Sequence, residues 1–256
     1  FTMAALTALL PVVLANNQTT SSIATNSQST TAENNAPSSF IEFNGSDQYM
    51  MIPHHADFNI TTTESFTVSC WVKRNVLEAD TRFVVKRVKN NATIKSGYEL
   101  WGNGISSQFF AVNSPNNTGD HNNSVSVYSN IPGYAGEWHH IAFVIDRTAG
   151  IMYEYHNGTA VANSGIKPIA PWECTNTYDV LVGAGFSEED TPNYFLNGAI
   201  GGLHFYKRAL SAEEITADAT AEVGPETDGL VAAYDFQNIT GLRVTDISGN
   251  GHTGTL

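Results

Sequence analysis

Aromatic side chains beside polar loops are the residues of this sequence best suited to hold a sugar. A sugar ring stacks on an aromatic face, while amides and carboxylates bind its hydroxyl groups. Each such ring can equally be a packing residue of the core or its rim, so both interpretations stay open here. The candidates for stacking are Trp71, Trp101, Tyr128, Tyr134 and Trp172.

Acidic and histidine clusters are the next groups with possible chemistry. Glu188-Glu189-Asp190 lies in a glycine-flanked loop region, where it could bind a cation or simply be solvated. The pairs His54-His55 and His139-His140 lack the spacing of a zinc site, because neighbours within a strand point to opposite faces. We therefore expect His139 and His140 to be packing residues of a strand.

The segments that must position these residues have the alternation of β-strands. Between Ser65 and Lys73, residues Phe66, Val68, Cys70 and Val72 share one face. Trp71 lies on the opposite, polar face, which we expect to be wet or ligand-facing except at Trp71 itself. Asn157-Gly158 favours a type I′ turn between two strands. Further strands are expected at Phe83–Lys86, Tyr98–Trp101, Gln108–Val112, Ser124–Tyr128, His139–Ile145, Ile151–His156, Tyr178–Val182 and Gly202–Tyr206.

Short strands at regular spacing predict an all-β, two-sheet antiparallel sandwich. A single helix is indicated after the last of these strands, where Ser211 is a helix N-cap and Glu214 occupies the third helical position.

Four segments in chain order resemble the laminin-G-like jelly rolls of the concanavalin A-like lectin and glucanase superfamily. The resemblance covers about residues 40 to 220 and implies a jelly-roll fold, but it says much less about a ligand, because function belongs to sites rather than folds. The segments are Ile41–Tyr49 (IEFNGSDQY), Phe66–Lys73 (FTVSCWVK), Gly136–Ala142 (GEWHHIA) and Asn197–Ile215 (NGAIGGLHFYKRALSAEEI).

Catalysis is not expected. The glucanases of this superfamily use a strand-borne Glu-x-Asp-x-x-Glu, whose alternate residues face one cleft, and this spacing does not occur in the sequence. No nucleophile elbow supports a triad of serine and histidine either. We therefore expect the protein not to be an enzyme.

A calcium site is implied by a further resemblance, to the pentraxin calcium loop. The loop 183–190 resembles it, and Lys89-Asn90-Asn91-Ala92 falls where pentraxins place an Asp-Asn pair. Calcium takes 6–8 oxygen ligands. The resemblance implies carboxylates from Glu188 and Asp190, neutral oxygens from Asn90 and Asn91, and the main-chain carbonyl of Glu189. Asn90 replaces an acid, and the alternative is a solvated acidic loop.

The two ends of the chain have their own compositions. Residues 1–15 (FTMAALTALLPVVLA) are apolar, too short to span a bilayer, and typical of the h-region of a secretory signal; a buried strand or an assembly anchor is the alternative. Residues 16–39 are rich in Asn, Ser and Thr and predict a flexible linker. Export would expose eight Asn-x-Ser/Thr sequons, at Asn17, Asn44, Asn59, Asn91, Asn116, Asn122, Asn157 and Asn238.

The expected domains are therefore a signal-like segment (1–15), a linker (16–39), a laminin-G-like jelly roll (40–221), and a tail (222–256). Gly229–Phe236 and Asp246–Leu256 resemble the opening of another such domain, so the tail is expected to be a linker and the start of a truncated second domain. The alternative is a permuted fold, in which the tail supplies the missing first strand of the jelly roll.

The net charge of the protein limits the kinds of partner that it can bind. Twelve Lys plus Arg against 25 Asp plus Glu give a net charge of −13, which argues against nucleic acid or an anionic membrane as a partner. Two cysteines allow at most one disulfide, and we expect two free thiols.

These observations predict a secreted or cell-surface, non-catalytic module that binds glycans or surface proteins. The first alternative is a structural subunit of an extracellular or particle-surface assembly, in which residues 1–39 join neighbouring copies. The second alternative is a diverged glycoside hydrolase.

Overall fold

The structure is a computed structural model. It describes residues 12–14, 36–77, 80–87, 95–114, 124–130, 135–161, 174–186, 191–220 and 223–256. Within these residues the elements are β1 (Val12–Leu14), β2 (Phe40–Asn44), β3 (Met50–Ile52), the 3-10 helix η1 (Ala56–Phe58), β4 (Phe66–Arg74), β5 (Thr81–Arg87), β6 (Lys95–Asn103), β7 (Ser106–Ser114), β8 (Ser124–Asn130), β9 (Trp138–Asp146), β10 (Ile151–His156), β11 (Thr159–Ala160), β12 (Val180–Val182), β13 (Gly185–Phe186), β14 (Pro192–Asn193), β15 (Asn197–Tyr206), α1 (Ala212–Asp218), β16 (Leu230–Tyr234), β17 (Ile239–Thr240), β18 (Arg243–Val244) and β19 (Gly254–Thr255).

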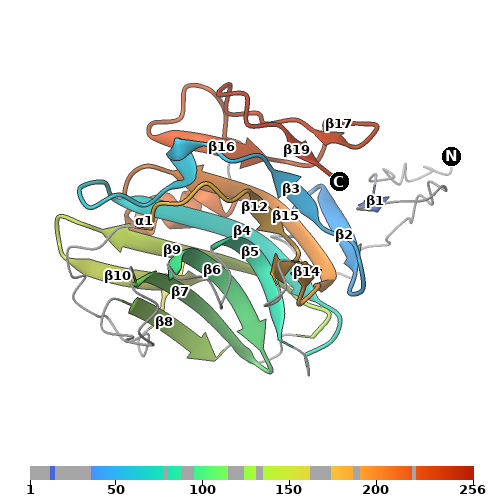
Figure 1. Ribbon diagram of the computed structural model, residues 1–256, viewed down its shortest axis with the longest axis horizontal. Helices are drawn as coiled ribbons and strands as arrows, with labels where there is room; N and C mark the ends of the chain where they lie inside the picture. Colours follow the sequence, from blue (N-terminus) through green and yellow to red (C-terminus); the bar gives the residue numbers. More distant parts are fainter. Residues whose placement is uncertain are drawn as a thin grey trace, which may run out of the picture.

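Two large sheets form a sandwich, which confirms the predicted fold class (Figure 1). Sheet A has the order β1-β2-β15-β4-β9-β10-β11, with β16 also paired to β15, and sheet B has the order β17-β18-β19-β3-β12-β5-β6-β7-β8. Except for the parallel pair β1–β2, neighbouring strands within these sheets are antiparallel. The strands expected from alternation all lie within strands of the structure or overlap them.

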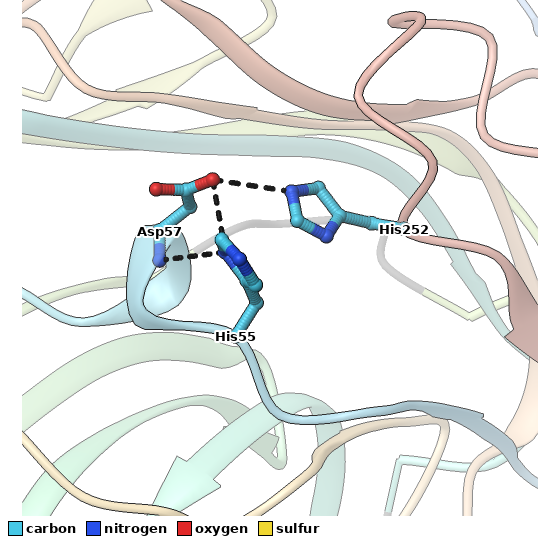
Figure 2. Close-up of side chains that lie close together, drawn as sticks. All are labelled: His55, Asp57 and His252. Carbon is cyan, nitrogen blue, oxygen red and sulfur yellow. Dashed lines mark hydrogen bonds and ion pairs between the residues drawn. The ribbon is translucent and has the colours of Figure 1, made fainter.

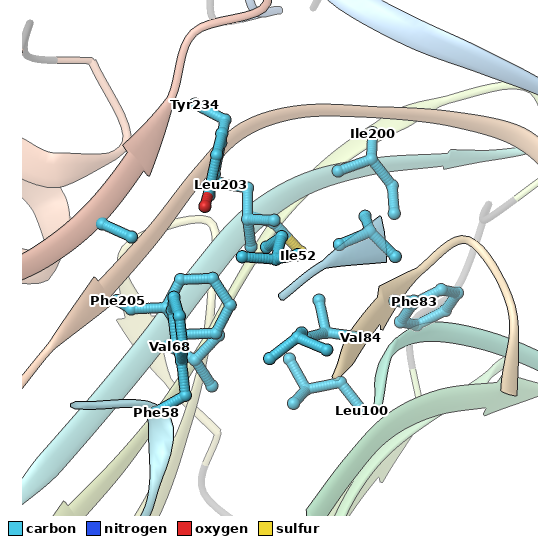
Figure 3. Packing of buried hydrophobic residues seen from close by; sticks show 14 of the residues in the cluster. Ile52, Phe58, Val68, Phe83, Val84, Leu100, Ile200, Leu203, Phe205 and Tyr234 are labelled. Carbon is cyan, nitrogen blue, oxygen red and sulfur yellow. The ribbon is translucent and has the colours of Figure 1, made fainter. Parts of the chain in front are cut away.

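The space between the sheets is filled by one apolar cluster, because each strand turns alternate apolar residues inward. Phe66, Val68, Cys70 and Val72 of β4 belong to it, as their alternation predicts. Figure 3 shows this core, with side chains from both sheets in contact range of one another. Both cysteines are buried, and they form no disulfide with each other.

The expected turn and helix are both present. Asn157 and Gly158 have φ of 49° and 77°, the left-handed backbone that a type I′ turn requires. Ser211 is the N-cap of α1, and its side chain and that of Glu214 form a reciprocal capping box. The helix packs through Ile215 on the outer face of sheet A, where a second, smaller apolar cluster lies. No helix of the described residues has both the length and the apolar character needed to cross a bilayer.

The tail contributes strands to both sheets. β16 pairs antiparallel with β15 in sheet A, and β19 joins sheet B beside β3. Tyr234 of β16 is fully buried in the main core, near Leu203 in Figure 3, and Figure 1 shows the red C-terminal strands alongside β3. Residues 230–256 thus add strands to both sheets and side chains to the core.

The N-terminal apolar segment is described over three residues only. Val12–Leu14 form β1, which pairs in parallel with β2 at the edge of sheet A.

Candidate functional site

The outer face of sheet B carries a row of polar and aromatic residues. In β6, Tyr98 and Leu100 point into the core, so Glu99 and Trp101 between them point outward. The register places Arg82 opposite Trp101, Trp101 opposite Gln108, and Gln108 opposite Tyr128. We call these four positions, one in each of β5, β6, β7 and β8, the outer row.

Arg82 is the central cation of this face. Its guanidinium lies 4.8 Å from the ring centroid of Trp101 and 4.5 Å from that of Tyr194, so it is held between two aromatic faces. Its Nε donates to Glu99 Oε2 at 3.0 Å, and Arg87 Nη1 donates to Glu99 Oε1 at 2.6 Å. Two arginines therefore share one carboxylate.

Two N–H donors of the outer row have no acceptor among the described residues: Arg82 Nη1 and Trp101 Nε1. An unpaired buried donor costs free energy, typically about 1–3 kcal/mol. Hydroxyl or carboxylate oxygens are the acceptors that such donors bind, and a ligand would reach these two buried atoms after movement of the side chains that cover them.

The hairpin of β13 and β14 covers one end of the outer row. A side chain in place of Gly185 would meet Arg82 Cγ at 2.7 Å, so only glycine permits this approach of the hairpin. The Arg82 side chain is consequently only 12% exposed. The other end of the row is open, since Tyr128 is 57% exposed. The face thus offers a covered, charged end and an exposed aromatic end.

Trp71 does not lie on a ligand-facing surface. Its ring is 6% exposed, because α1 and the residues after it cover this part of sheet A. Its Nε1 donates to the Ala219 carbonyl at the end of α1, and its ring contacts His140. The face of β4 that looked wet in the sequence is polar because it meets the helix, and these contacts give Trp71 a packing role.

The remaining predicted residues are divided between described and undescribed parts of the chain. Trp101 and Tyr128 lie in the outer row. Tyr134, Trp172 and the five calcium candidates Asn90, Asn91, Glu188, Glu189 and Asp190 lie outside the described residues.

The glycosylation sequons are similarly divided. Asn44, Asn157 and Asn238 are exposed, and Asn59 is half-buried. Asn17, Asn91, Asn116 and Asn122 lie outside the described residues. The amide groups of Asn44 and Asn157 are engaged in local hydrogen bonds, with Asp47 and with the His140 N–H respectively, whereas Asn238 is exposed beside the strand β17.

Sequence reasoning missed Arg82, Arg87, Glu99 and Tyr194. The signal for Glu99 was present, because it is a polar residue at an outward position of a predicted strand, while Arg82 and Arg87 directly flank the strand predicted at Phe83–Lys86. Tyr194 carried no such signal, because it has φ of 55° in the turn after β14 and reaches Arg82 only through the tertiary fold.

Comparison with known families gives one match. The model of the laminin G-like group described as the concanavalin A-like lectin/glucanases superfamily matches residues 44–216. A search of curated proteins gives no match.

Solved structures with a similar fold have low sequence identity. A Bacteroides ovatus protein assigned to carbohydrate binding has a TM-score of 0.58 and 14% identity, and the match covers 81% of this chain and 55% of that one. The binding domain of botulinum neurotoxin serotype D has a TM-score of 0.50 and 15% identity, covering 69% of this chain and 40% of that one. The chain thus spans about half the length of these two proteins or less.

Proposed function

Because the chain belongs to the concanavalin A-like lectin/glucanases superfamily, we propose that it is a non-catalytic module that binds glycans through the outer face of sheet B. The observation that carries this proposal is the outer row, in which Arg82 lies between two aromatic rings and two N–H donors have no acceptor. The carbohydrate-binding description of the Bacteroides ovatus protein, which shares the fold, supports the same class of ligand.

The chemistry of the outer row favours an acidic glycan. An exposed aromatic ring at Tyr128 can stack on a sugar. A guanidinium binds a carboxylate or sulfate group more strongly than a neutral hydroxyl, because the hydrogen bond is charge-assisted. Arg82, whose Nη1 has no acceptor among the described residues, provides that charge.

A glycan array with neutral, sialylated and sulfated glycans tests this function. We expect binding to acidic glycans, weakened at least about tenfold by Arg82→Gln and by Tyr128→Ala, since each removes an interaction worth more than about 1 kcal/mol. Ile105→Ala is the matched control, because Ile105 is 48% exposed at the turn between β6 and β7 but outside the row. Unchanged binding by both row variants would overturn the assignment of this face.

Export and glycosylation belong to the same proposal. Expression with a secretory signal in a glycosylating host should add a glycan at Asn238, the exposed sequon beside β17. The measurement is the mass lost on enzymatic removal of N-glycans, compared between the unaltered protein and Asn238→Gln. Equal mass losses would show that Asn238 carries no glycan.

Calcium binding by Asn90, Asn91, Glu188, Glu189 and Asp190 is a further part of the proposal. The ring of Phe186, just before the acidic loop, packs on Tyr178 with centroids 6.0 Å apart, and the Tyr178 carbonyl accepts from Lys86 Nζ. Millimolar calcium should raise the melting temperature, and Asp190→Ala should remove this rise while Asp80→Ala, an exposed control, keeps it. If neither calcium nor a chelator changes the melting temperature, the calcium site does not exist.

A structural role in an assembly is the second candidate function, and β1 favours it. This strand adds to the edge of sheet A at β2, and an edge strand can pair in the same way with another copy of the chain. Light scattering should then show oligomers that disappear on deletion of residues 1–39. A protein that stays monomeric with these residues present would rule the role out.

A further inference from the structure

Three potential metal ligands from distant parts of the chain meet at the surface of the sandwich. His55 and Asp57 belong to the turn of η1, and His252 comes from the tail (Figure 2). One ligand atom from each residue lies within 4.8 Å of the other two. His55 Nδ1 is 2.9 Å from Asp57 Oδ2, and His252 Nε2 is 3.3 Å from the same oxygen.

These distances fit the edges of a tetrahedral metal site. Zinc binds imidazole nitrogen and carboxylate oxygen at about 2.0–2.2 Å, so adjacent ligand atoms around a tetrahedral ion lie about 3.3–3.6 Å apart. The two contacts to Asp57 Oδ2 are 2.9 and 3.3 Å, and the ligand nitrogens of the two histidines lie within 4.8 Å of each other. Two imidazoles and one carboxylate form a ligand set that zinc accepts.

Hydrogen bonds alone do not explain the short contacts of Asp57 Oδ2 with the two histidines. His55 Nδ1 accepts from the backbone N–H of Asp57 at 3.3 Å, so it presents a lone pair there. One ring nitrogen cannot also donate to Asp57 Oδ2, although that oxygen is only 2.9 Å away. His252 Nε2 is buried and has no hydrogen-bond partner. A cation between these atoms would take the lone pair of His55 Nδ1 in place of the Asp57 N–H, and it would give His252 Nε2 and the carboxylate a common partner.

His252 is held in place before any ion binds. Its backbone N–H donates to Asp246 Oδ2 at 2.9 Å, and its carbonyl accepts from the Tyr234 hydroxyl at 2.5 Å. Its ring packs edge-on against Phe58, with centroids 4.9 Å apart, and its side chain is only 8% exposed. A ligand fixed in this way loses little conformational entropy on metal binding.

Lys207 is the nearest competing cation. Its Nζ lies 3.6 Å from Asp57 Oδ1 and 3.4 Å from Glu64 Oε1. It therefore uses the other oxygen of Asp57 and is shared with a second carboxylate. Asp57 Oδ2 remains directed at the two histidines, as Figure 2 shows.

The site also has an open side. A shallow pocket of about 230 Å³ adjoins His252 and is lined by Pro53, Arg243, Gly251, His252, Thr253 and Thr255. Sites with three protein ligands keep the fourth position for water or another small ligand. The side chains of His55 and Asp57, which are 53% and 38% exposed, leave the site accessible to such a group.

We propose that His55, Asp57 and His252 bind one Zn²⁺ ion, and that this ion links the tail to the η1 turn. The proposal is independent of glycan binding, because the site lies at η1 and the tail rather than in the outer row of sheet B.

Titration calorimetry with ZnCl₂ on the full chain, stripped with chelator beforehand, tests the site. One ion per chain should bind and raise the melting temperature. His252→Gln and Asp57→Asn should each weaken binding more than about tenfold, the loss that even outer-shell partners of a metal can cause. Substitution with Co²⁺ should give the intense visible absorption of a tetrahedral site, and His252→Gln should remove it.

The matched control is His156→Gln. His156 lies against His139 in a different pair, with ring nitrogens 2.7 Å apart, and this variant should bind zinc like the unaltered protein. If His156→Gln loses zinc binding while both site variants keep it, the ion binds at His139 and His156 instead, and the proposal is wrong. Absence of binding by the unaltered protein, or binding unaffected by any variant, would overturn the proposal.

Discussion

Glu154 is a carboxyl group buried between the two sheets. On β10 of sheet A it accepts hydrogen bonds at Oε1 from Ser107 at 2.5 Å and Ser129 at 2.7 Å, both in sheet B, while Oε2 has no partner. Burial raises the pKa of Glu154 from 4.5 to about 7, although the two serine hydrogen bonds act in the opposite direction. The carboxyl group therefore changes its charge near neutral pH.

This pKa predicts how stability depends on pH. The folded state holds the proton between pH 4.5 and about 7, where the unfolded state has lost it, so stability should fall as the pH rises through this window. The fall is on the order of 3 kcal/mol. Glu154→Gln keeps the shape without the charge and should be the more stable protein at pH 8.

Urea denaturation at pH 5 and pH 8 measures the effect. Glu137→Gln is the control, since the Glu137 side chain is 66% exposed and its change should leave the pH dependence intact. The free energy of unfolding at pH 5 minus that at pH 8 should be larger for the unaltered protein than for Glu154→Gln. If the two proteins give the same difference, the burial of a charged Glu154 does not limit stability.

At the scale of single residues the sequence predicted part of the candidate site. Trp101 and Tyr128 were identified because aromatic residues beside polar loops are recognisable in a sequence. Arg82 was not, because its role depends on Tyr194, which is 112 positions away in the chain and meets it only after folding. Trp71 was placed on the correct face of its strand, but the helix that covers this face could not be located from strand alternation.

The helix α1 is fixed to sheet A by a buried polar network around Asp218. Asp218 accepts hydrogen bonds from Ser69 at 2.5 Å and Tyr206 at 2.5 Å, and its Oδ1 is 2.9 Å from His204 Nδ1. Burial alone would raise the pKa of Asp218, but His204 and His140 outweigh it and hold the pKa well below the ordinary value of 3.8. Its ionised form is thus part of the folded structure.

Removal of this carboxylate should loosen the helix. Asp218→Ala leaves the buried partners unpaired, and we expect a loss of about 3–5 kcal/mol in the free energy of unfolding, with a smaller loss for Asp218→Asn. The stability that the ionised group contributes is complete above pH 3.8 and is lost as the pH falls toward its lower folded-state pKa.

Chemical denaturation of the variants at pH 7 checks this prediction. Asp228→Ala, which changes an acid that is 91% exposed, should have a far smaller effect. A similar small effect of Asp218→Ala would mean that the network does not hold the helix.

The sequence predicted the helix and the turn better than it predicted which residues pack against them. The capping box at Ser211 and the turn at Asn157-Gly158 depend on residues close in sequence, so local patterns identify them. The short strands β13, β14, β17, β18 and β19 were not predicted, because two paired residues carry no alternation to detect.

For the whole molecule, the tail is the feature with the largest consequence. Deletion of residues 228–256 would remove β16 from sheet A and β17, β18 and β19 from sheet B, and would uncover apolar surface around Leu203 and Ile52. We expect the shortened protein to lose cooperative unfolding. Tyr234→Ala should cost about 3–5 kcal/mol, the range for a large buried side chain.

Thermal unfolding of these variants provides the measurement. Leu242→Ala is the control within the tail, because Leu242 is 50% exposed. A deletion variant with the melting temperature of the intact chain would show that residues 40–221 fold without the tail, as expected for the start of a separate domain.

The position of the tail also has a consequence for synthesis on the ribosome. Strands β2, β3 and β4 emerge early, yet β15 and β3 obtain their neighbours β16 and β19 only after residues 230–255 have left the exit tunnel. The nascent polypeptide must therefore keep two unfinished sheet surfaces from aggregating until these residues have been synthesised. Such late closure makes a chaperone that shields hydrophobic strands a natural requirement for high-yield production of this protein.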